Sequence, residues 1–127
     1  MDKVRAYNAF LSSFNIPAID EQSVYDTPIL EQLGFPNMYI TYEFAVGELD
    51  APVTLSIDLW HKSTSWREIE AKAAEIAQAI GNGGKKVHYD GGSIWITRST
   101  PVYQRMDAAN EDYRRIHFNI NAEYLSA

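Results

Sequence analysis

The stretch LSIDLWHKSTSWREIEAKAAEIAQAI, residues 55–80, changes its hydrophobic period near its middle. Up to Trp60 the apolar residues occupy every second position, which is typical of a strand with one buried face. From Ser65 onward they recur at intervals of three and four, which is typical of an amphipathic helix. The stretch therefore predicts a strand joined to a helix by a very short connection.

Signals at both ends delimit the predicted helix. Ser65 and Glu68 have the spacing of a capping box, and Gly81 stands where a glycine lets the chain leave a helix. One stripe of the helix is apolar and is formed by Trp66, Ile69, Ala73, Ile76, Ala77 and Ile80. We expect this stripe to cover the apolar side of the neighbouring strands.

Long alternating strands occur on both sides of this unit. Residues 38–46 alternate, a turn follows at residues 47–52, and residues 53–60 alternate again, which predicts an antiparallel hairpin. A third long strand is predicted near the C-terminus. Its apolar side is formed by Ile116, Phe118, Ile120, Ala122 and Tyr124.

The remaining segments are shorter or less regular. Helical spacing predicts an amphipathic helix over residues 2–14, and the proline-containing residues 15–36 predict a partly packed connector. A short hairpin is predicted at residues 87–97, and the polar residues 104–112 predict a mobile loop. Together the segments predict one α+β domain over residues 1–127. Its mostly antiparallel sheet of long strands is covered on one face by the N-terminal helix and the central capped helix.

Composition narrows the class of protein. Apolar residues make up 46% and charged residues 22% of the 127 residues, which is typical of a single globular domain. The net charge of -6 disfavours a nucleic-acid groove, which needs clustered Lys and Arg. The chain has no cysteine, no signal-peptide pattern and no apolar run of roughly 20 residues. We therefore expect a soluble intracellular protein without disulfides or a membrane span.

The sequence predicts no enzyme, metal site or cofactor. His61, His88 and His117 come from separate segments without metal-ligand spacing, and the GNGGKK sequence at residues 81–86 follows a helix instead of opening one. Asp58 and His117 would form a proton-transfer pair only if their strands are neighbours in a pocket. A polar pair on an exposed sheet face is the commoner arrangement.

The polar side of the predicted sheet is unusual because it mixes aromatic and acidic residues. Tyr39 and Trp60 lie on it together with Glu43, Asp58 and Glu123. A monomer can leave such a face in water. Alternatively the face or the sheet edges are used for assembly, since aromatic residues are favoured at interfaces.

Three segments in this order resemble one family of proteins. They are FPNMYITYEF at residues 35–44, V.LSIDLW..S....EIEAKAAEIAQAI at residues 53–80, and RRIHFNINAEY at residues 114–124. The chain is similar over nearly its whole length to the tail completion, or tail terminator, proteins of long-tailed bacteriophages and prophages. The likeness lies in residue type and element order, not in an active-site signature.

The resemblance implies a structural role without catalytic or cofactor residues. It implies a homo-oligomeric, usually hexameric, ring that caps the tail tube protein and joins it to the head-tail connector protein. DNA would pass through the ring without specific binding. The expected location is the tail-head junction of the virion, after assembly in the host cytoplasm. A related head-tail joining role remains open, and no membrane partner is implied.

Loops on a rigid scaffold are the expected contacts with the tail tube or the connector, because binding segments are drawn disproportionately from loops. The candidates lie in residues 47–51 and 104–112. They include Gly47, Asp107, Asn110 and Glu111.

Two alternatives come from other classes. A small acidic binding or immunity-type protein that masks a basic partner would be a monomer that forms a one-to-one complex. A small enzyme would hold Asp58 and His117 in a pocket.

Excess carboxylates in the lumen of a ring would repel DNA phosphates instead of retaining them. The lumen or rim candidates are Glu43, Glu48, Asp50, Asp58 and Glu123. Changing several of them to Lys is therefore expected to slow or block DNA passage, measured as loss of infectivity of phage that carry the variant. Normal infectivity would contradict the lumen hypothesis.

Overall fold

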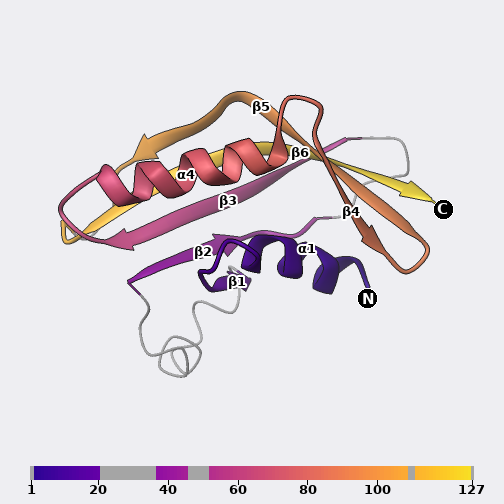
Figure 1. The fold of residues 1–127 in the computed structure, drawn as a ribbon, viewed down its shortest axis with the longest axis horizontal. Helices are drawn as coiled ribbons and strands as arrows, with labels where there is room; N and C mark the ends of the chain where they lie inside the picture. Colours follow the sequence, from indigo (N-terminus) through magenta and orange to yellow (C-terminus); the bar gives the residue numbers. More distant parts are fainter. Residues whose placement is uncertain (1, 21–36, 46–51, 109–110, 127) are drawn as a thin grey trace.

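The structure, a computed structural model, describes residues 2–20, 37–45, 52–108 and 111–126. Two helices and six strands occur in these ranges (Figure 1). The helices are α1 (Lys3–Ser12) and α4 (Arg67–Ile80). The strands are β1 (Ala18–Asp20), β2 (Met38–Tyr42), β3 (Val53–Lys62), β4 (Lys85–Tyr89), β5 (Gly92–Met106) and β6 (Tyr113–Ser126).

The strands form one sheet in the order β1-β2-β3-β6-β5-β4, in which only β1 and β2 are parallel. The predicted hairpin is confirmed, since β2 and β3 pair from Met38 opposite His61 to Tyr42 opposite Ile57. The second hairpin is also confirmed, with Tyr89 opposite Gly92 across its turn. The α+β prediction therefore holds.

Both helices lie on the same side of the sheet (Figure 1). The alternating apolar residues of β3, β5 and β6 face the predicted stripe of α4, so that strand and helix periods meet in one core. Helix α1 contacts both edge strands, β1 and β4, and the Lys72 ammonium of α4 donates to Phe14 O at 2.9 Å. The sheet therefore curls so that α1 contacts both of its edge strands.

An aromatic cluster joins α1 to the sheet. The Tyr7 ring is edge-on to Tyr42 at 5.4 Å between centroids and lies 5.6 Å from Phe44, which is 6.2 Å from Tyr124. Burial raises the pKa of Tyr7, and it raises the pKa of Tyr124 to about 12. The Tyr124 hydroxyl donates to Ala45 O at 2.6 Å, so this ring is held at its polar end as well.

The capping-box prediction for α4 is wrong. The helix begins at Arg67. Ser65 Oγ accepts from the backbone N–H of Arg67 at 3.2 Å, whereas in a capping box it would accept from the N–H of Glu68, one residue later. Glu68 does not reach back along the chain, because its carboxylate lies 3.2 Å from His61 Nε2 on β3. The predicted stop at Gly81 is confirmed by its φ of 72° and by its N–H bond to Ala77 O.

Two strands extend beyond the sequence predictions. β5 continues to Met106, so the predicted loop loses its first three residues to the sheet, and its pairing with β6 is interrupted between Arg98 and Tyr103. Such a bulge hides the period of a strand from the sequence. β1 lies in the predicted connector. Its three residues are too few to show an alternating pattern in the sequence, and they form a strand by pairing with β2. Most of that connector, residues 21–36, lies outside the described residues.

Adjacent glycines after α4 offer a test of the turn into β4. A Cβ on Gly84 would lie 2.7 Å from Ile96 O at a φ of 86°, whereas a Cβ on Gly83 would meet nothing within 4 Å. We expect Gly84→Ala to lower the free energy of unfolding by more than about 1 kcal/mol, because backbone strain adds to the clash. The matched variant Gly83→Ala is expected to change it little. Urea denaturation measures both, and equal effects would contradict this account of the turn.

Candidate functional site

The candidate site lies on the sheet face opposite the helices. Alternation along three neighbouring strands brings polar and aromatic side chains to this face, whereas their sequence neighbours point into the core. None of the described helices covers it. Its central members are Tyr39 and Thr41 on β2, Asp58 and Trp60 on β3, and Arg115 and His117 on β6.

Asp58 is the centre of a charged cluster. Its Oδ1 accepts from Arg115 Nε at 2.9 Å and lies 3.0 Å from His117 Nδ1. His117 is directly opposite Asp58 in the β3–β6 register, so the backbone pairing itself brings the two side chains together. Asp58 is only 7% exposed although neither of the described helices lies above it. Its carboxylate is covered and paired by neighbouring side chains of the same face.

Trp60 forms the aromatic half of the cluster. The Arg115 guanidinium lies 5.1 Å from the centre of the Trp60 ring, and Tyr39 stacks against Trp60 at 6.4 Å with an angle of 15° between the rings. Trp60 Nε1 donates to Thr41 Oγ1 at 2.9 Å, which fixes the orientation of the indole. We call these residues, together with Asp58 and His117, the open-face cluster.

The open-face cluster is better suited to contact than to proton transfer. Trp, Tyr and Arg are the residue types that dominate the binding energy of protein interfaces. The Asp58 oxygen near His117 also holds Arg115, and the pair lines neither the hollow beside Trp66 nor the groove between α1 and β4. Alternation along the sequence predicted that these side chains share one face of the sheet. The contact between Arg115 and Trp60 could be known only from the β3–β6 register, which places the two residues opposite each other.

Metal chemistry has no candidate in the described ranges, where no group of three or more His, Asp or Glu side chains could hold an ion. His61 is buried on the helix side of β3 and pairs with Glu68, and His88 is exposed on β4. The helices α1 and α4 are both too short and too polar to cross a membrane, and they are the helices that the structure describes.

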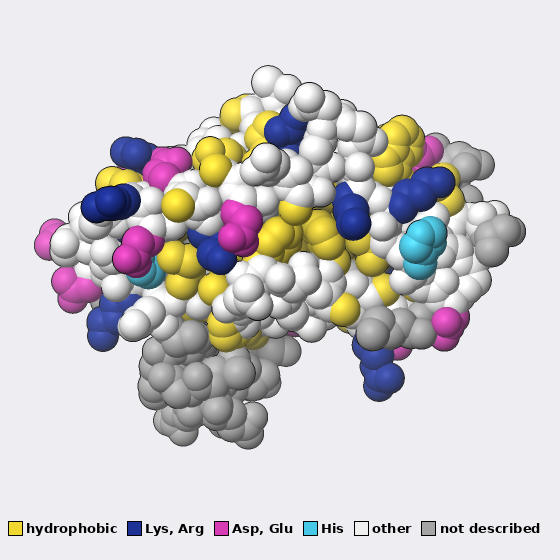
Figure 2. All heavy atoms as spheres, viewed as in Figure 1, with side chains coloured by type: hydrophobic (Ala, Val, Ile, Leu, Met, Phe, Trp, Pro, Cys, Tyr) yellow, Lys and Arg dark blue, Asp and Glu magenta, His cyan; other side chains and the backbone are white. Residues whose placement is uncertain are grey.

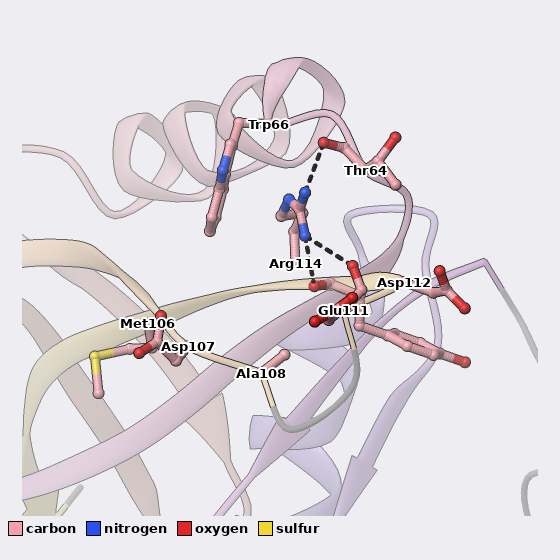
Figure 3. Close-up of a pocket in the computed structure, with 9 residues that line it drawn as sticks. Thr64, Trp66, Met106, Asp107, Ala108, Glu111, Asp112 and Arg114 are labelled. Carbon is pink, nitrogen blue, oxygen red and sulfur yellow. Dashed lines mark hydrogen bonds between the residues drawn. The ribbon is translucent and has the colours of Figure 1, made fainter.

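A hollow of about 500 Å³ lies at the start of α4 (Figure 3). Trp66 forms one wall, and guanidinium groups lie on its ring at 4.6 Å for Arg105 and 5.5 Å for Arg114. Arg105 is held in turn by Glu70 at 2.6 Å. Nothing in the spacing of the sequence indicated this arrangement, because Arg105 lies near the end of β5 and Arg114 near the start of β6.

Arg114 joins the segments around this hollow. Its guanidinium donates to Thr64 O at 2.8 Å, to Glu111 O at 3.0 Å and to Tyr113 O at 3.2 Å. Figure 3 shows the group between Trp66, Thr64 and the segment that leads into β6. The short joint between β3 and α4 is therefore tied to the start of β6.

The predicted lumen residues fall in different places. Glu43 follows β2, and Glu123 lies near the end of β6, opposite Trp95. Since β3 is antiparallel to β2 and β6, both carboxylates lie toward the end of the sheet where β3 begins. Asp58 lies farther along β3 and is neutralised by Arg115. Glu48 and Asp50 lie outside the described residues.

The predicted loop contacts lie at the other end of the sheet. Asp107 follows β5, and Glu111 precedes β6, next to the end of β3. Both are exposed and line the hollow beside Trp66. Gly47 and Asn110 lie outside the described residues.

Comparison of the chain with protein-family models, with curated proteins and with solved structures finds no match in any of the three.

Replacing Asp58 tests whether the open-face cluster is a cooperative unit. Asp58→Asn removes the charge that pairs with Arg115, and we expect a loss of about 1–3 kcal/mol in the free energy of unfolding. The matched control is Glu43→Gln, since Glu43 is exposed. Urea denaturation of both variants measures the difference. Equal stability of the two variants would mean that the Asp58 contacts contribute nothing to the fold.

Proposed function

We propose that this protein is a structural tail completion or terminator protein of a phage or prophage. In this proposal several copies form a ring, usually of six, that caps the tail tube, joins the head connector and lets DNA pass. The class of protein comes from the resemblance of residues 35–44, 53–80 and 114–124 to that family, and the structural observation that supports assembly is the open-face cluster. It presents Trp60, Tyr39 and Arg115 in fixed orientations on a face that no described helix covers.

Fixed orientation favours binding. Trp60 is held by its bond to Thr41, and Arg115 is held by Asp58, so these groups lose little conformational freedom when a partner covers them. The half-buried aromatic and guanidinium surfaces resemble the centre of a protein interface, where charged groups are paired and aromatic groups are enriched. A neighbouring subunit is the partner that the proposal assigns to this face.

The two ends of the sheet support a subunit with two different axial contacts. The exposed carboxylate of Glu43 and the half-exposed carboxylate of Glu123 belong to one end. The hollow at Trp66, with Asp107 and Glu111, belongs to the other. A ring between tail tube and connector needs unlike surfaces at its two openings, and in this proposal the Glu43 end faces the DNA path.

Oligomer size is the first measurement. Light scattering over a range of concentration and salt, followed by negative-stain imaging, is expected to reveal rings of one size. Arg115→Glu reverses the central charge of the open face and is expected to abolish the rings. Arg67→Glu is the matched control, because Arg67 is exposed on α4, on the helix side of the molecule.

A second variant separates assembly from folding. Tyr39→Ala removes the stacked ring without touching the Asp58–Arg115 pair, and it is expected to weaken the rings while circular dichroism stays unchanged. Rings that survive in both Arg115→Glu and Tyr39→Ala would exclude the open face as the subunit contact. A strict monomer at every concentration, which also fails to bind purified tail tube protein, would instead favour the acidic binding protein.

A further inference from the structure

A groove of about 380 Å³ lies between α1 and β4, at one edge of the sheet. Its helix side has the three- and four-residue spacing of a single helix face and is formed by Ala6, Ala9, Phe10 and Ser13. Its strand side is formed by Lys85, Lys86, Val87 and His88. We call it the edge groove.

Four consecutive residues of β4 line the edge groove, and this pattern shows where the groove lies relative to the strand. Successive side chains of a strand point to opposite faces of the sheet, so a hollow over one face would be lined by alternate residues. A hollow lined by residues 85–88 without interruption must follow the free edge of β4. In the described part of the chain, β4 pairs with β5 alone and has no strand on this side.

The register indicates which backbone groups lie on that edge. Tyr89 and Gly92 flank the two-residue turn, so they form a hydrogen-bonded pair. Such pairs alternate along an antiparallel ladder, so Val87 and Lys85 also direct their backbone groups toward β5. The backbone N–H and C=O groups of Lys86 and His88 therefore point away from β5. An extended segment entering the edge groove can pair with them, as in β-strand addition.

The edge groove is basic in an acidic protein. Lys85, Lys86 and His88 are all exposed, whereas the chain has a net charge of -6. Figure 2 shows Lys or Arg and His side chains gathered over β4, beside a hydrophobic band between the two helices. Since Lys85 and Lys86 point to opposite faces, an added strand would meet a cation on each side. Lysines on an edge discourage neutral or basic strands from pairing, and they favour an acidic one.

We propose that the edge groove binds the acidic residues 21–36 of a second copy of this chain. That segment contains Glu21, Asp26 and Glu31, has no Lys or Arg, and has apolar residues such as Val24 and Ile29 that suit the groove floor around Phe10. This inference rests on the ring of the proposed function and adds a specific contact to it. A groove on one copy and a segment on the next form a head-to-tail interface, which closes into a ring when the rotation allows.

Photo-crosslinking between two isotopic forms of the full chain tests this proposal. A photo-reactive amino acid replaces Ser13, which lines the groove and is exposed. Light and heavy copies are unfolded together, refolded as a mixture and irradiated, and the crosslinked peptides are mapped by mass spectrometry. The expected product joins position 13 of one copy to residues 21–36 of the other. Crosslinks within one copy only, crosslinks to another segment, or none would overturn the proposal.

Charge exchange makes the result specific. The double variant K85E/K86E is expected to lower the yield of the intermolecular crosslink by about tenfold, because two attractions become repulsions. Adding E21K and E31K to K85E/K86E is expected to restore it. Lys62→Glu is the control, since Lys62 is exposed at the end of β3 and does not line the groove. Equal yields in K85E/K86E and Lys62→Glu would overturn the charge argument.

The outcomes separate this inference from the proposed function. Rings that form without a crosslink to residues 21–36 would overturn the edge-groove contact alone. A crosslink to that segment in a species that never forms rings would support the contact and overturn the ring. The open face and the edge groove are lined by different residues, so Arg115→Glu and K85E/K86E probe them independently.

Discussion

The pairing of β3 with β6 at the centre of the sheet is the constraint on which the other features depend. It runs in one register from Val53 opposite Ala122 to Lys62 opposite Tyr113. Because side chains alternate, this register assigns Leu55, Ile57 and Leu59 to the helices and the residues between them to the open face. A slip of one residue would exchange the two sets, so the core selects the register and the register assembles the open-face cluster.

Side-chain contacts explain how a short connection between β3 and α4 holds the strand and the helix together. Residues 63–66 carry the chain from β3 to α4, and Arg114 at the start of β6 binds the Thr64 carbonyl and lies on Trp66. Glu68 contacts His61, which ties the first turn of α4 to the end of β3. Side-chain contacts from other strands thus replace the local cap. The strand-to-helix unit is held as one block, and Thr64, Trp66 and Arg114 of this unit and its brace line the hollow.

The two surfaces proposed for assembly have different chemistry. The open face is aromatic, with its charges paired through Asp58, and it suits burial against another subunit. The edge groove is bordered by lysines and by backbone groups of β4 that point away from β5, and it suits an extended acidic segment. A subunit with the open face as its single contact surface would pair with the same face of a second copy and form a twofold dimer. A second, unlike surface gives the molecule a direction, which a closed head-to-tail ring requires.

The sequence by itself determined the periodic elements: both helices, the long strands, their buried faces and the two hairpins, because hydrophobic periodicity and turn residues are local signals. It also determined that Asp58, Trp60 and His117 share the polar side. Tertiary structure decided the rest. β1 and the far half of β5 are strands because β2 and β6 lie beside them, and the Ser65–Glu68 spacing failed as a cap because His61 offered Glu68 a partner. The contacts of Arg105 and Arg114 with Trp66 join residues separated by dozens of positions, and no local pattern encodes which distant side chains a folded chain brings within reach.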